Sequence, residues 1–136
     1  MTVSPYLTFN GNCAEAIALY ENAFGVKAKI MRYKDAPPSE GYQPPVGTED
    51  YVMHAQFNIG NDAIMFCDTT PEMKTGFGSG MAIHVGLSDI ESVKKAFDIL
   101  KEGGKVGMEL QETFWNKRFG SLEDKFGVNW MISLDS

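Results

Sequence analysis

The sequence predicts an α+β fold built from two copies of a βαβββ module. Two pairs of positions support this: Asn12 and Asp89 each open a helical pattern, and Tyr20 and Phe97 each lie eight residues further along. Both pairs are separated by the same interval (89 − 12 = 97 − 20 = 77). A duplicated unit of this size is expected to form two matched halves related by a pseudo-twofold axis. We therefore expect two half-barrels that form a cup, with a ligand in its cleft.

Length and composition are those of one compact globular domain. The chain has 136 residues, of which 43% are hydrophobic. Its net charge of −6 and its scattered 12 Lys and Arg argue against a nucleic-acid partner, which needs clustered basic residues. No apolar run approaches the roughly 20 residues that span a membrane, and the first residues lack a signal-peptide pattern. The two cysteines form no CxxC pair, so we expect a reduced, cytoplasmic protein.

The first module is expected at residues 1–70. A strand at 5–10 precedes Asn12, which together with Glu15 has the spacing of a helix N-cap and capping box. Gly25 suits the left-handed position that ends a helix. Between these two ends, four residues at helical spacing form an apolar stripe, namely Cys13, Ile17, Tyr20 and Phe24.

Three strands are expected to complete this module, with a long loop after the first of them. Their ranges are 27–34, 51–59 and 63–67. Prolines and glycines predict a loop or lid at 36–50. Apolar and polar residues alternate along 51–59, and the Gly-Asn-Asp at 60–62 supplies the turn that follows.

A linker at 71–80 leads to the second module, at residues 81–136, in which the same order recurs. Asp89 caps its helix, and the glycine pair at 103–104 ends it. The apolar stripe of this helix contains Ile90, Val93, Phe97 and Leu100. The four strands are expected at 81–87, 105–111, 119–123 and 128–134. We expect each helix to cover the convex face of its curved sheet, within a single domain.

Three segments resemble those of a known family. Residues 6–17 read Tyr-Leu-Thr-Phe-Asn-Gly-Asn-Cys-Ala-Glu-Ala-Ile, residues 111–115 read Gln-Glu-Thr-Phe-Trp, and residues 124–132 read Asp-Lys-Phe-Gly-Val-Asn-Trp-Met-Ile. With the paired βαβββ order, they resemble the PhnB-like branch of the vicinal oxygen chelate (VOC) superfamily, which includes glyoxalase I, extradiol dioxygenases and bleomycin-resistance proteins. The resemblance implies a glyoxalase/bleomycin-resistance-like curved sheet cup and a homodimer. That branch often carries a name inherited from demethylubiquinone methyltransferases, but no glycine-rich loop for S-adenosylmethionine is present, so we do not expect methyl transfer.

The resemblance also implies four metal-ligand positions that face into the cup and usually hold His, Gln or Glu. Strand and helix register assigns these positions to Pro5, Phe66, Ala82 and Met131. A shift of one residue gives Tyr6, Cys67, Ile83 and Trp130. Neither set has the His, Gln or Glu donors of a metal site, so we expect no metal and no cofactor. One alternative is a rebuilt metal site that uses His54, His84 and Asp68.

The expected site is a small-molecule pocket with apolar walls and few polar groups. Its predicted members are Leu7, Phe9, His54, Phe66, Asp68, His84, Trp115, Arg118 and Met131. His84 either lines this pocket or acts as a general base, because an imidazole titrates near neutrality. Trp115 and Arg118 can bind a planar or anionic ligand. The alternative for Trp115 is packing at a subunit contact or over the rim of the cup. Trp130 is expected in the core.

The function that the sequence favours is binding of a small molecule in an apolar cup, without a metal. A second class is an enzyme of the superfamily, either a metal-dependent lyase, isomerase or dioxygenase or a metal-free enzyme that uses His84. A third class is sequestration of a bulky cationic drug, as in bleomycin-resistance proteins, and the acidic net charge is compatible with it. The expected partners are a small-molecule ligand and a second copy of the chain.

Overall fold

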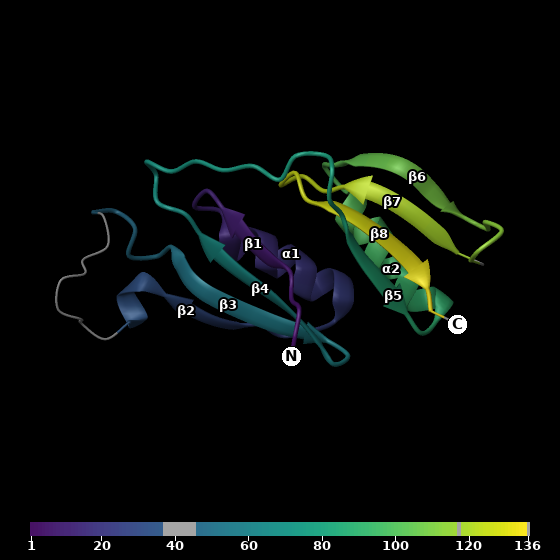
Figure 1. Cartoon of the computed structure of the whole chain (residues 1–136), viewed down its shortest axis with the longest axis horizontal. Coiled ribbons are helices and arrows are strands. Elements are labelled where there is room, and N and C mark those ends of the chain that lie inside the picture. The colour runs from purple at the N-terminus through teal and green to yellow at the C-terminus, as the bar shows by residue number, and fades with distance from the viewer. Residues whose placement is uncertain (37–45, 117, 136) are drawn as a thin grey trace. The chain divides into compact units, whose positions relative to one another are not determined.

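The computed structural model describes residues 1–36, 46–116 and 118–135 (Figure 1). The chain divides into two compact units, residues 1–18 with 26–76 and residues 19–25 with 77–136. Much of the loop or lid expected at 36–50 lies outside the described residues. Within the described ranges, no helix is long and apolar enough to cross a bilayer.

The first unit contains a four-stranded sheet, which we call sheet one (Figure 1). The elements in this part of the chain are β1 (Tyr6–Phe9), α1 (Cys13–Phe24), β2 (Lys29–Arg32), the 3-10 turn η1 (Tyr33–Asp35), β3 (Val52–Ile59) and β4 (Asp62–Asp68). The strand order is β1-β4-β3-β2, with β1 parallel to β4 and the other pairs antiparallel. The first half of α1 belongs to this unit, and its last turns belong to the second unit.

The second unit repeats this arrangement in sheet two. Its elements are β5 (Ile83–Leu87), α2 (Ile90–Lys101), β6 (Lys105–Gln111), β7 (Phe119–Glu123) and β8 (Asn129–Leu134). The strand order is β5-β8-β7-β6, again with one parallel pair, β5 and β8, and two antiparallel pairs. The two sheets therefore share one topology, which confirms the predicted α+β fold with two βαβββ modules.

Both helices bury most of the apolar stripe that their sequences predict, but Phe24 in α1 is only partly buried and Ile90, at the start of α2, is 40% exposed. In α2 the buried side chains are Val93, Ala96, Phe97 and Leu100, and this helix packs on all four strands of sheet two. Trp130 of β8 is fully buried, which confirms its predicted place in the core. Tyr20 and Phe24, in the last turns of α1, pack against the Trp130 ring with centroid distances of 5.0 and 5.3 Å.

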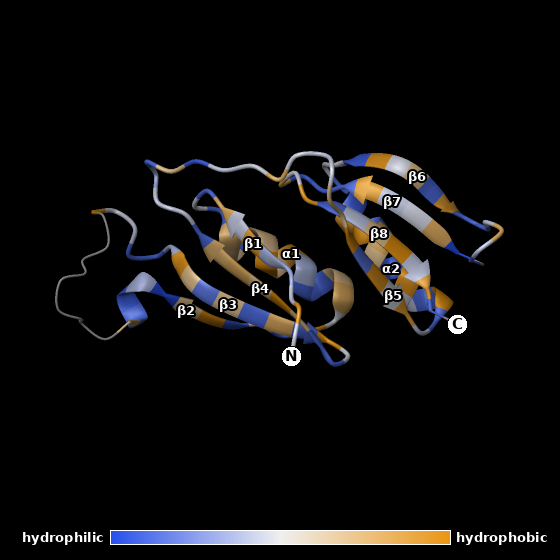
Figure 2. Ribbon diagram, viewed as in Figure 1, coloured by the Kyte–Doolittle hydropathy of each residue, from blue (hydrophilic) through white to orange (hydrophobic). Residues whose placement is uncertain are grey.

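The strand predictions are correct in order. Those at 105–111 and 119–123 match β6 and β7 at both ends, and the others differ by one or two residues at one or both ends. The largest difference is the strand expected at 27–34, which extends only from Lys29 to Arg32. The backbone N–H of Arg32 donates to the Asp35 carboxylate at 3.1 Å, within the 3-10 turn that replaces the last part of the expected strand. Apolar and polar side chains alternate along β3, as predicted, and Figure 2 shows the alternation as bands of two colours.

Candidate functional site

Each sheet has one buried face and one face that we call the open face. In sheet one, Leu7 lies opposite Phe66 and Phe9 lies opposite Asp68, so these four residues share the buried face. On the open face are their sequence neighbours Tyr6, Thr8, Met65 and Cys67, with His54 and Gln56 from β3. In sheet two, the open face carries His84, Met131, Ser133, Ser121 and Glu123.

Three of the predicted pocket residues lie in the core of the first unit. Phe9 and Phe66 are 2% and 0% exposed, and their rings pack at 6.5 Å. Asp68 is 3% exposed and accepts hydrogen bonds from the backbone N–H groups of Gly11, Cys13 and Val52. This carboxylate therefore holds the start of α1 and the start of β3 in place. These three residues, and Leu7 on the same face, do not reach the open face.

The lengths of two connections explain why Leu7 and Phe9 of β1 lie on the buried face and not in a pocket. The helices are offset by 77 positions (90 − 13), as the sequence predicts. Three residues join β1 to α1, at 10–12, and only two join β5 to α2, at 88–89. Equivalent strand residues are therefore 78 positions apart, and a slip of one residue moves a side chain to the other face of a strand. The counterpart of His84 is therefore Tyr6, 78 positions earlier, whereas an offset of 77 would have matched His84 with Leu7.

The open face of sheet one carries a small polar cluster. The Tyr6 hydroxyl and Nδ1 of His54 share a hydrogen bond of 3.0 Å, with the ring centroids 5.7 Å apart. Thr8 Oγ1 lies 3.6 Å from the Cys67 thiol sulfur. Partial burial, and then the nearby Cys67 thiol, raise the pKa of the Tyr6 phenol above its ordinary value. Tyr6 therefore remains a neutral hydrogen-bonding group near neutral pH.

On sheet two, His84 lies beside Met131 and bonds to Ser133. Nε2 of His84 and Oγ of Ser133 are 2.7 Å apart, and Ser133 is 3% exposed. Met131 lies directly opposite His84 on the neighbouring strand and is 39% exposed. Two residues of the predicted pocket therefore lie side by side on this open face.

A hollow of about 410 Å³ continues from Met131 across this sheet. It is lined by Ser79, Gly80, Met81, Ala82, Lys105, Val106, Gly107, Ser121, Leu122, Glu123, Asn129, Trp130 and Met131. Asn129 Nδ2 donates to the carbonyl oxygens of Gly78 and Met81, at 3.0 and 3.2 Å, so the segment before β5 is tied to β8. The hollow presents an apolar surface with a few polar groups, which suits a small organic ligand.

The polar residues that line this hollow are not among the pocket residues predicted from the sequence. Lys105 and Glu123 are opposite each other on β6 and β7. The sequence pattern that could have predicted this lining is the alternation in β7, where the buried Leu122 separates Ser121 from Glu123. Gly107 is a second indication in the sequence, because a Cβ atom at this position would lie only 2.9 Å from Ser121 Oγ.

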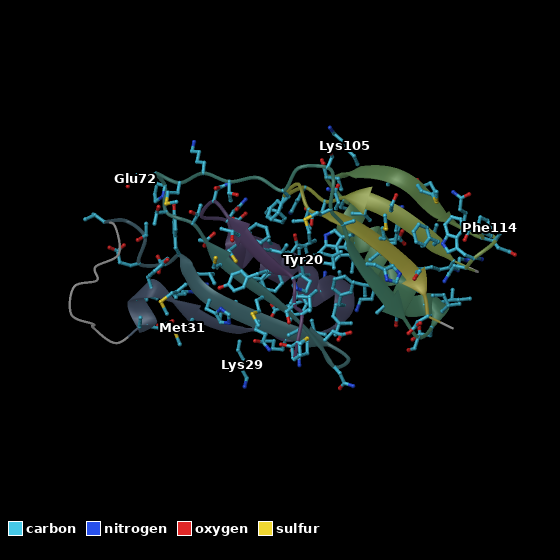
Figure 3. All side chains as sticks on the ribbon, in the orientation of Figure 1. Tyr20, Lys29, Met31, Glu72, Lys105 and Phe114 are labelled. Carbon is cyan, nitrogen blue, oxygen red and sulfur yellow. The ribbon has the colours of Figure 1, made fainter. Side chains whose placement is uncertain are left out.

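Trp115 and Arg118 lie in the connection between β6 and β7. Trp115 is 55% exposed and meets Phe119 edge-on at 5.6 Å, and its neighbour Phe114 is 97% exposed. Phe114 projects from the outer end of this connection (Figure 3). The backbone N–H of Arg118 donates to Asn116 Oδ1. Neither Trp115 nor Arg118 lines the hollow described above.

The donors on the open faces do not fit the metal site that the superfamily implies. The strands that usually supply its ligands present Tyr6, Thr8, Met65 and Cys67 in one sheet and His84, Gly86, Met131 and Ser133 in the other. These sets contain a single imidazole and no carboxylate, whereas divalent metals take His, Cys, Asp and Glu in groups of three or four. Within the described ranges, no three such residues are grouped. Asp68, a member of the alternative site, already accepts three backbone hydrogen bonds.

Comparison with known proteins identifies the family of this chain. The model of the 3-demethylubiquinone-9 3-methyltransferase family matches residues 1–133. The chain belongs to this family. Protein YjdN of Escherichia coli (strain K12) is 36% identical over 144 residues, covering 98% of this chain and 95% of the relative.

Solved structures of similar chains agree with the family and with the fold. Protein PA1353 from Pseudomonas aeruginosa is 34% identical, with a TM-score of 0.85 over 99% of this chain and 98% of the other. A putative 3-demethylubiquinone-9 3-methyltransferase, PhnB protein, from Bacillus cereus is 27% identical, with a TM-score of 0.76 over 99% and 100%. A glyoxylase/bleomycin resistance protein/dioxygenase domain from Frankia sp. EAN1pec, at 12% identity, has a TM-score of 0.67 over 100% and 98%. These findings confirm the PhnB-like branch and the VOC fold.

Proposed function

We propose that the open face of sheet two binds a small organic molecule in the 410 Å³ hollow, without a bound metal ion. The hollow is the observation that carries the proposal, because its volume falls within the range of about 300–1,000 Å³ that is usual for small-ligand pockets. Met81, Val106 and Met131 offer an adaptable apolar surface for the body of the ligand. Lys105 and Glu123 offer a cation and a carboxylate that orient its polar groups.

A thermal-shift screen of a metabolite library, followed by calorimetric titration of each compound that raises Tm, tests this proposal. We expect Met131→Ala to weaken binding about tenfold, because it removes roughly 1.4 kcal/mol of apolar contact. Met73→Ala is the matched control, since Met73 is 70% exposed and does not line the hollow. A library without a single stabilising compound, or equal binding by the two variants, would contradict the proposal.

A metal-free enzyme is the second candidate, and the His84–Ser133 contact favours it. Their 2.7 Å separation allows proton exchange between the imidazole and the hydroxyl, next to Met131 at the edge of the hollow. If a turnover assay is found for a ligand from the screen, His84→Gln should abolish turnover and retain binding. Unchanged turnover in that variant would remove His84 from any catalytic role. Methyl transfer, which the family name describes, forms no part of either candidate.

The resemblance to VOC proteins also leads us to propose a homodimer. Light scattering in solution provides the test, and a single species at the chain mass of 15.0 kDa would contradict a dimer.

A further inference from the structure

A second hollow, of about 590 Å³, lies in the first unit and is separate from the site proposed on sheet two. It is lined by Val26, Lys27, Lys29, His54, Gln56, Phe57 and Asn58. Lys29 lies opposite Gln56, and Met31 lies opposite His54, on the antiparallel strands β2 and β3. Side chains that are opposite on neighbouring strands share a face of the sheet. Lys29, Gln56 and His54 are therefore all on the open face of sheet one.

The lining of this hollow is positively charged. Lys27 and Lys29 are exposed, and Figure 3 shows Lys29 projecting away from the ribbon. The described lining residues include no Asp or Glu. The ion pairs formed in the described parts of the chain involve other lysines. Two ammonium groups without a carboxylate partner create a local positive potential in a chain whose net charge is −6.

The neutral side chains of the hollow supply directional donors. Nδ1 of His54 is engaged with the Tyr6 hydroxyl at 3.0 Å, which leaves Nε2 for a ligand. Gln56 Nε2 donates to Asn58 Oδ1 at 3.2 Å. This contact orients the Asn58 amide and leaves its Nδ2 group as a donor. Ammonium, amide and imidazole N–H groups thus line the same space.

We propose that this hollow binds an oxyanion, a carboxylate or a phosphate, carried by a small molecule. The two ammonium groups attract the anion, and hydrogen bonds from the imidazole and the amides orient its oxygens. The inference rests on sheet one alone and does not depend on the function proposed for sheet two.

The test is an NMR titration of the full chain with inorganic phosphate and, separately, with succinate. We expect saturable shifts of the side-chain amide signals of Gln56 and Asn58 with at least one anion. The anion that causes these shifts shows whether the hollow binds a carboxylate or a phosphate. Lys29→Gln should weaken binding about fivefold, because an exposed ion pair contributes up to about 1 kcal/mol. The Lys27→Gln/Lys29→Gln double variant should weaken it further.

Lys95→Gln is the matched control, because it makes the same change of charge at an exposed position of α2. We expect this variant to bind as the wild type does. Signals that move with neither anion, or equal weakening in Lys95→Gln and Lys29→Gln, would overturn the inference. The Asn129 side-chain amide signals report on the other hollow, so failure of this proposal is distinguishable from failure of the proposed function.

Discussion

Removing the Tyr20 hydroxyl is expected to destabilise the protein by about 2 kcal/mol. This hydroxyl donates to Asp124 Oδ2 at 2.6 Å, and the carboxylate is only 2% exposed. Asp124 also accepts from Trp130 Nε1 at 2.8 Å and from the backbone N–H groups of Phe126 and Val128. A hydrogen bond to a charged group contributes about 1.5–3 kcal/mol net. Because three donors would still satisfy Asp124, we expect Tyr20→Phe to cost an amount in the lower half of that range.

Urea unfolding followed by tryptophan fluorescence measures this cost. The buried Trp130 lies 5.0 Å from the Tyr20 ring and reports on the affected packing. We expect a lower midpoint and an unchanged m-value, because the substitution exposes no additional surface. Tyr51→Phe removes the same atom from a tyrosine that is only partly buried, and should change stability by less than about 0.5 kcal/mol. A Tyr20→Phe variant as stable as this control would refute the reasoning.

Two further predictions follow from ionisable groups. Burial raises the pKa of the Cys13 thiol above its ordinary range, so iodoacetamide at about pH 8 should modify Cys67 well before Cys13 in the folded protein. Peptide mass spectrometry measures both sites, and equal rates would contradict the prediction. Hydrogen bonds from Ser92 hold the pKa of the Asp89 carboxyl below its usual value, and a lowered pKa adds stability that is lost as pH falls through it. Asp89→Asn should therefore lose less stability than the wild type between about pH 5 and pH 3, and an identical loss in urea unfolding would exclude this role.

The helices were predictable because their signals are local. Asp89 accepts from the Ser92 backbone N–H at 2.8 Å, as an N-cap residue should. The apolar stripes of both helices are set by spacing along the sequence, and the two helices begin 77 residues apart (90 − 13), as predicted. At the start of α1, by contrast, the amides of Gly11 and Cys13 are bound by Asp68, more than 50 residues away in sequence. No local pattern indicates that contact.

The site was less predictable because it depends on which face of each strand is buried. Phe9 and Phe66 suit a pocket wall and a core equally well by residue type, and the structure buries both. Their polar neighbours Thr8 and Cys67 lie on the open face instead. The hollow on sheet two depends on strands β6, β7 and β8 meeting the segment before β5, which only the folded chain brings together.

The sequence by itself determined the duplication, the order of elements and the family, because repeat interval, helical stripes and turn residues are properties of neighbouring positions. Only the tertiary structure decided which side chains face a ligand. Side chains alternate along a strand with a period of two, so the single extra residue between β1 and α1 is enough to move each side chain of β1 to the other face of the sheet. That residue places Tyr6 in the position that corresponds to His84, and leaves Leu7 on the buried face.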